Sequence, residues 1–174
     1  MTPGTVALCP PLPLAPAPDG PDLPDLADAL LDDPRLSGVR VLLPAVPDAA
    51  PDDDRRTANA HWVAHLAIGL ATGGAVAPVL LVLVGAAGEL APALGFSQKA
   101  SRRAVSGYVL VDAVVPPAES RGGDWPDAPV VYVASPSADP LQANQARLRG
   151  WDVVEVPDAS APAIAETLAR IVAG

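Results

Sequence analysis

The sequence predicts an α/β fold, namely a three-layer sandwich in which helices cover both faces of a mostly parallel, doubly wound sheet. Short β-branched segments alternate with Ala- and Leu-rich segments along the chain. Residues 79–84 are apolar at every position, as expected of a central strand that is buried on both faces. Half of the residues are hydrophobic but only 3% are aromatic, so Ala, Val and Leu must fill the interior between the layers.

The first half of the chain alternates strands and helices between proline-rich loops. Residues 5–8 and 39–43 are expected as strands, because aliphatic and β-branched side chains dominate them. A helix is expected at 25–31, where three leucines share one face, and a longer one at 55–72, which two glycines close. The prolines in 10–24 and 44–54 predict loops there.

The second half contains the clearest strand signals. Strands are expected at 78–84, 108–111, 130–134 and 153–156, and helices at 140–149 and 161–172. Gly85-Ala86-Ala87-Gly88 is expected to turn sharply into a helix that begins at Glu89. The 174 residues contain no internal repeat and suit a single domain of this size.

Charge and composition exclude several classes of function. The formal net charge of −9 disfavours nucleic acid and anionic membrane surfaces as partners. Cys9 is the only cysteine, so an internal disulfide and a multi-cysteine zinc site are excluded. The N-terminus lacks a basic segment, and prolines interrupt its apolar runs, which argues against a signal peptide. Two histidines, paired glycines and Pro78 interrupt the apolar stretch 58–84, so no membrane span is expected and a reducing cytoplasm is the predicted location.

Four segments of the second half resemble a known family. The buried strand at 80–84 leads into Gly85-Ala86-Ala87-Gly88-Glu89, at the position where a serine hydrolase carries G-x-S-x-G. Residues 107–117, 129–134 and 151–157, together with Asp139-Pro140, follow in the order and spacing of small actinobacterial-type α/β-hydrolases. The resemblance covers roughly residues 79–174. It implies one α/β-hydrolase-like domain over residues 1–174, without a cap domain.

The departures from that family concern its catalytic residues. Ala87 occupies the position of the serine nucleophile, and a methyl group cannot attack a carbonyl. The histidine position falls at 158–160, where Ser160 stands instead. Asp139 matches the acid position, and Asp112 is the second candidate for it. Glu89 replaces the second glycine and would repel an oxyanion. The resemblance therefore implies a catalytically degenerate protein that is not a serine hydrolase.

The same resemblance predicts where the vestigial site lies. Ala87 is expected at the tip of the turn, with a strained backbone and with its methyl group facing a cavity. Asp139 and the segment around Ser160 are expected to border that cavity. With Ala86 and Ala87 as an apolar floor, the predicted partner is a small apolar molecule or another protein, and no cofactor is expected. A homodimer is a further assembly that the sequence allows.

Two other functions stay open at this point. The chain can be an active hydrolase, lyase or cyclase that relies on Asp112, Asp139 or His61. Alternatively, the loop from Gly85 to Gly88 can cradle a nucleotide phosphate, with Asp112 near the place of a ribose-binding acid. Ala91 stands where the third glycine of such a loop is expected, which argues against the second alternative.

The remaining reactive side chains are expected to play structural roles. His61 and His65 share one helix face at i and i+4, but the segment between them lacks the glutamate of the common zinc motif. Cys9 follows the first strand and is expected as an inert buried thiol. The acidic clusters at 25–32 and 52–54 are expected to be solvated or to cap helices, so no metal site is predicted.

Overall fold

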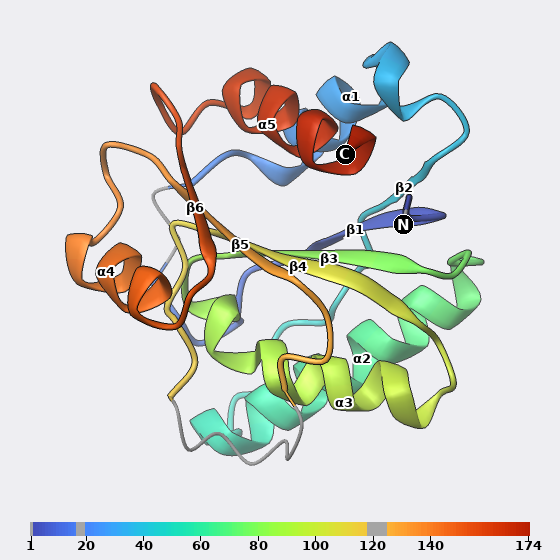
Figure 1. Ribbon diagram of the computed structural model, residues 1–174. Helices are drawn as coiled ribbons and strands as arrows, with labels where there is room; N and C mark the ends of the chain where they lie inside the picture. Colours follow the sequence, from blue (N-terminus) through green and yellow to red (C-terminus); the bar gives the residue numbers. More distant parts are fainter. Residues whose placement is uncertain (1, 17–19, 118–124) are drawn as a thin grey trace.

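Six parallel strands form one sheet in the computed structural model of the chain, which describes residues 2–16, 20–117 and 125–174 (Figure 1). The strands are β1 (Thr5–Cys9), β2 (Arg40–Leu42), β3 (Val79–Val84), β4 (Val105–Val111), β5 (Val130–Ala134) and β6 (Asp152–Glu155). Their order across the sheet is β2-β1-β3-β4-β5-β6, and every neighbouring pair is parallel. The chain thus winds outward from β1 in both directions, which confirms the predicted doubly wound α/β sandwich.

Helices cover both faces of this sheet (Figure 1). They are α1 (Leu23–Leu31), α2 (Arg55–Thr72), α3 (Ala91–Ala100), α4 (Pro140–Leu148) and α5 (Ala161–Ala173), with the 3-10 helices η1 (Pro34–Leu36) and η2 (Gly85–Leu90). α1 and α5 pack side by side on one face, and buried residues of α2, α3 and α4 pack on the other. Among the described residues, no helix is both long enough and apolar enough to cross a membrane.

Short polar side chains begin four of the five α-helices. The N-cap residues Asp22, Asp54, Asp139 and Ser160 each accept a hydrogen bond from a backbone N–H two or three residues further along. Such a cap satisfies a donor that the helix itself leaves unpaired and contributes about 1 kcal/mol. Three of these helices also carry a proline in the first turn, where its missing N–H costs nothing.

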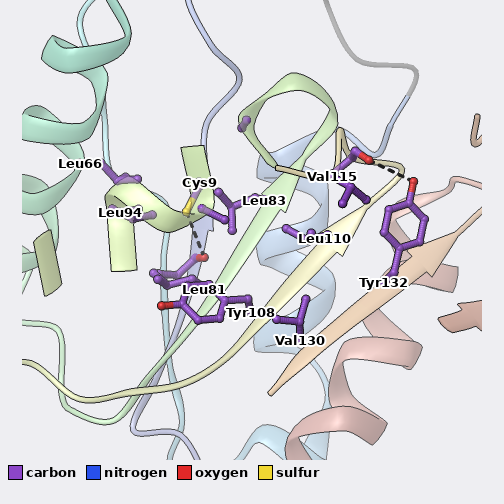
Figure 2. Packing of buried hydrophobic residues seen from close by; sticks show 14 of the residues in the cluster. Cys9, Leu66, Leu81, Leu83, Leu94, Tyr108, Leu110, Val115, Val130 and Tyr132 are labelled. Carbon is purple, nitrogen blue, oxygen red and sulfur yellow. Dashed lines mark hydrogen bonds between the residues drawn. The ribbon is translucent and has the colours of Figure 1, made fainter. Parts of the chain in front are cut away.

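β3 is the centre of the hydrophobic core. All six of its residues are buried, and alternate side chains point to opposite faces of the sheet. Leu81 and Leu83 pack towards Leu66 of α2 and Leu94 of α3, in the cluster that Figure 2 shows. Leu80 and Val82 face the other way, towards α1 and α5. A strand that is buried on both faces explains why this segment carries no polar residue.

The element boundaries differ from the prediction where tertiary contacts override local preference. α1 begins at Leu23, inside the segment predicted as a loop, because Asp22 caps it and Pro24 is tolerated in the first turn. β4 begins at Val105, three residues early, because Val105 pairs with Val79 of β3. The helix predicted from Glu89 begins instead at Ala91, after the 3-10 helix η2.

Candidate functional site

The carboxyl ends of all six strands meet at one edge of the sheet, where α/β folds hold their ligands. At this edge β3 runs directly into η2 through Gly85, whose φ of 57° lies in the left-handed region that glycine adopts without strain. The carbonyl oxygen of Gly85 accepts a hydrogen bond from Val114 N at 2.9 Å. The turn after β3 is therefore tied to the segment that follows β4.

Gly88 is a glycine because another part of the backbone lies against it. A Cβ atom at this position would lie 2.5 Å from the carbonyl oxygen of Val114 and 2.8 Å from Cβ of Ala113. Such distances are far shorter than van der Waals contact, so any side chain would displace the chain after β4. Close packing at Gly88 and the left-handed backbone at Gly85 therefore give each glycine of this turn a structural reason.

The structure places Ala87 differently from the sequence-based expectation. Ala87 lies inside η2, its side chain is completely buried, and it belongs to the cluster beneath α2 and α3. The left-handed backbone falls on Gly85, two residues earlier, and not on Ala87. The expectation of a strained Ala87 whose methyl group faces a cavity was wrong, because the glycine absorbs the turn and the following 3-10 helix directs the methyl group into the core.

The neighbours of Ala87 in this turn are less enclosed. Ala86 is partly buried and packs against the same core cluster. The carboxylate of Glu89 forms an ion pair with Arg55 of α2, with Nη2 and Oε2 3.1 Å apart. This pair was not predicted, because Arg55 lies 34 residues away in the sequence. It ties the start of α2 to the turn after β3.

Asp112 follows β4 at this edge, and both its backbone conformation and its carboxylate are constrained. Its φ of 45° is unusual for a residue other than glycine. Its carboxylate accepts a bond from Ser135 N at 2.8 Å and one from Ser135 Oγ at 2.6 Å, and Ser135 Oγ lies 2.8 Å from Ser137 Oγ. Bonds of this kind to a charged acceptor offset the cost of the left-handed backbone.

The two serines of this network were missed at the sequence level. Ser135-Pro136-Ser137 comes directly after β5, and small polar residues at the carboxyl end of a strand were the available signal. Asp112 and Tyr132 are also linked electrostatically, because burial first and the charge of Asp112 second raise the pKa of the Tyr132 hydroxyl. Tyr132 donates its hydroxyl to the carbonyl oxygen of Ala113 at 3.1 Å (Figure 2).

The predicted acid and histidine positions both act as helix caps. Asp139 Oδ1 accepts a hydrogen bond from Leu141 N at 2.9 Å and begins α4. Ser160 Oγ accepts from Ala163 N at 3.4 Å and begins α5. Ser160 N donates to Asp158, and its hydroxyl and backbone bonds lower the pKa of the Asp158 carboxyl. Each of the two residues thus has a structural role at the carboxyl edge.

A cavity of about 660 Å³, here named the proline-lined pocket, opens at the carboxyl ends of β1, β2 and β3. Its described lining consists of Pro10, Pro11, Gly20, Pro21, Asp22, Leu23, Pro24, Leu43, Pro44, Ala45, Val46 and Val84. Aliphatic and proline side chains dominate this lining, and prolines hold its loops with little conformational freedom. Asp22 contributes the one charged side chain among these described residues. The pocket lies where the sheet winds in opposite directions, which is a common place for ligands in such folds.

A second cavity of about 520 Å³, here named the helix-end cavity, adjoins the proline-lined pocket. The two share Gly20, Pro21 and Asp22, and the helix-end cavity extends between the amino ends of α1 and α5. Its further described lining consists of Asp25, Ala29, Ala159, Ser160, Ala161 and Pro162. Asp22 therefore lies at the junction of the two cavities.

The histidines and the cysteine lie elsewhere. His61 Nδ1 is 3.4 Å from Asp53 Oδ2, and both histidines line a cavity of only about 110 Å³. Cys9 is completely buried, burial raises the pKa of its thiol, and Sγ lies 3.8 Å from the carbonyl oxygen of Ala7. Within the described ranges, no three His, Cys, Asp or Glu side chains are grouped so as to hold a metal ion.

Comparisons with known proteins give a fold and no close relative. No protein-family model matches the sequence, and no curated protein matches it. Carboxyl esterase 2 from the mycorrhizal fungus Tuber melanosporum superposes with a TM-score of 0.59 at 11% identity, over 99% of this chain and 77% of the esterase. The Vlm2 thioesterase domain gives 0.59 at 14% identity, over 98% of this chain and 92% of that domain. A putative α/β-superfamily hydrolase from Xanthomonas campestris pv. campestris gives 0.54 at 17% identity, over 98% and 96%.

These similarities establish the architecture. The six-stranded parallel sheet with its flanking helices is the α/β fold of α/β-hydrolases, which confirms the predicted fold class. At such low identity, the similarity shows the fold and does not assign the activities of those proteins to this chain.

Proposed function

We propose that this chain is a catalytically degenerate α/β-hydrolase-like protein that binds a small apolar molecule in the proline-lined pocket. One observation supports this most directly: the predicted catalytic positions hold structural groups, while an apolar cavity opens at the same carboxyl edge of the sheet. The actinobacterial type of the chain, its cytoplasmic location and its assembly state stay predictions of the sequence.

The chemistry at the three predicted positions supports the non-catalytic half. Ala87 lacks an oxygen nucleophile and is completely buried, so a substrate carbonyl could not reach it without local unfolding. Ser160 is a helix cap and has no imidazole to act as a base. Asp139 is likewise a helix cap, so it has a structural reason to occur in this sequence. Without a nucleophile and a base, serine-type acyl transfer falls by orders of magnitude.

The shape and lining of the proline-lined pocket support the binding half. A volume of about 660 Å³ falls within the range of small-molecule sites. Its walls come from the loops after β1 and β2 and from the start of α1, which are separate segments of the chain. A buried alkyl group contributes about 0.8 kcal/mol per methylene, before association costs of several kcal/mol. For an eight-carbon chain, the burial amounts to about 6 kcal/mol and exceeds an association cost of about 4 kcal/mol, so weak binding in the millimolar range is expected.

The first test is the binding of 1-octanol, followed by amide chemical shifts of the isotope-labelled protein. We expect saturable shifts at Val84, Leu43 and Ala45, which line the pocket. Ala45 is exposed at its rim, so Ala45→Trp should fill the opening without disturbing the core, and should weaken octanol binding about tenfold. The matched control is Ala71→Trp, at an exposed position near the end of α2, which should leave the affinity unchanged.

The second test addresses catalysis. We expect no hydrolysis of p-nitrophenyl butyrate above the buffer rate and no covalent labelling by a fluorophosphonate probe, since Ala87 carries no hydroxyl. Stoichiometric labelling of any serine would refute the non-catalytic half. Octanol shifts that are absent, or that Ala45→Trp leaves unchanged, would refute the binding half.

A further inference from the structure

We propose that the ligand of the proline-lined pocket is an amphiphilic cation, whose apolar part fills this pocket and whose ammonium group lies beside Asp22 and Asp25. This inference rests on the proposed binding function and specifies its ligand class. Asp22 is the one charged side chain among the described residues that line the proline-lined pocket, and it also lines the helix-end cavity. Asp25 lines the helix-end cavity as well.

The position of Asp22 sets the orientation of such a ligand. Asp22 lines both cavities, while apolar residues such as Leu43 and Val84 line only the proline-lined pocket. An alkyl chain bound in the first cavity can therefore reach the junction with a polar group at its end. Asp22 and Asp25 are both exposed, so a cation beside them would keep part of its hydration and would not need full desolvation.

The positive amino ends of α1 and α5 disfavour a cation, so their charge has to be compared with that of the two carboxylates. Both helix ends border the helix-end cavity, and each carries a partial charge of about +0.5. The carboxylates of Asp22 and Asp25 contribute two full negative charges, so the balance at the cavity is about −1. Among the described residues that line the two cavities, there is no Lys, Arg or His that would offset it further.

The electrostatic field of the whole molecule is negative as well, and it also favours a cationic ligand. The net charge is −9, which raises the local concentration of cations and lowers that of anions around the protein. Of the molecules with equal apolar parts, a cationic one is therefore favoured over a neutral one, and an anionic one is disfavoured. Because the carboxylates are exposed and screened by salt, the preference is expected to be about three- to tenfold at low ionic strength.

The experiment compares octylammonium, 1-octanol and octanoate, which share one alkyl chain and differ in charge. Dissociation constants are measured by amide shifts at neutral pH and low salt. We expect octylammonium to bind about three- to tenfold tighter than octanol, and octanoate to bind weakest. Asp22→Asn should remove most of the preference for octylammonium over octanol, measured as the ratio of the two dissociation constants within the same variant. Asn is as good an N-cap as Asp, so α1 should stay folded.

The control is Asp54→Asn, which removes one negative charge from the N-cap of α2, away from the two cavities. It should leave the preference intact. If Asp54→Asn lowers the preference as much as Asp22→Asn does, only the net charge is acting and the assigned headgroup site is wrong. If octanol binds in the pocket but octylammonium binds no tighter, the cationic ligand class is wrong and the proposed function still stands. If octanol itself fails to bind, the proposed function is wrong, and this inference falls with it.

Discussion

Cys9 lies at the carboxyl end of β1, among the side chains that face α2 and α3 (Figure 2). Its thiol is completely buried, and burial disfavours the thiolate and raises its pKa. Only the thiolate reacts as a nucleophile, and a reagent must also reach it. A residue at the end of a strand, where active sites are common, is here a small apolar part of the core.

Thiol labelling gives a direct check of this description. In the native protein, the reaction of Cys9 with a disulfide reagent should be at least about a hundredfold slower than in concentrated guanidinium chloride, since reaction requires opening of the structure. The signal needs no assignment because the chain has no other cysteine. Rapid, complete labelling under native conditions would contradict the burial of this side chain.

At the carboxyl edge, the hydrogen bonds of Asp112 stabilise a backbone conformation that is unfavourable for this residue. A left-handed backbone costs an aspartate roughly 1 kcal/mol, which the two bonds from Ser135 offset. The position thus holds the loops after β4 and β5 together. The same reasoning applies to Gly88, where the carbonyl of Val114 leaves no room for a Cβ atom.

Among the elements, β3 is the one on which the sheet depends most. It pairs with β1 on one side and β4 on the other, and both of its faces are covered by helices. Its side chains interlock with the helices above and below, so a lost side chain leaves a cavity that the rigid centre of the sheet cannot close.

Truncation of single buried side chains of β3 measures how much the stability of the fold depends on this strand. Leu83→Ala should lower the free energy of unfolding by about 2–5 kcal/mol, as should Leu81→Ala, since both side chains are completely buried. The control is Leu148→Ala at the end of α4, whose leucine is 88% exposed and should change stability by less than about 0.5 kcal/mol. Urea denaturation measures all three. A change below about 0.5 kcal/mol at both β3 positions would contradict the central place of the strand.

At the scale of the whole molecule, lowering the pH changes the stability of the fold in two opposite ways. The net charge of −9 makes the folded chain repel itself, and partial protonation relieves this repulsion. Several carboxyl groups oppose that gain because the folded state holds them ionised. A hydrogen bond and the charge of Arg35 lower the pKa of Asp33 to about 2, the backbone of Thr57 lowers the pKa of Asp54, and Ser160 lowers that of Asp158.

The resulting pH dependence has a defined sign. Because these three pKa values are lower in the folded state, the unfolded state binds more protons, and their stabilisation is lost as the pH falls below about 4. For Asp33 the loss continues down to a pH of about 2. We therefore expect the urea midpoint to hold or rise slightly between about pH 7 and pH 5 and to fall below about pH 4. A midpoint that keeps rising below pH 4 would contradict this description.

Local patterns in the sequence determined the architecture. The apolar run at 79–84 and the alternation of strand and helix segments predicted the parallel sandwich, because burial and periodicity are properties of neighbouring residues. The ends of α2 were predicted correctly, since an acidic N-cap and paired glycines are local signals as well. The likeness of the segment after residue 79 to α/β-hydrolases likewise rested on consecutive residues, and the fold agrees with it.

The details of the carboxyl edge were decided only by the tertiary structure. Whether Ala87 faces a cavity or the core depends on how η2 packs against the segment after β4. The hydrogen bond between Asp112 and Ser135 joins residues that lie 23 positions apart in the sequence. The proline-lined pocket is assembled from the loops after β1 and β2, the start of α1 and the end of β3. Cavities and long-range hydrogen bonds depend on the relative placement of distant segments, which no local pattern encodes. The sequence could therefore predict the sheet, while the placement of the loops decided which residues line the pocket at its carboxyl edge.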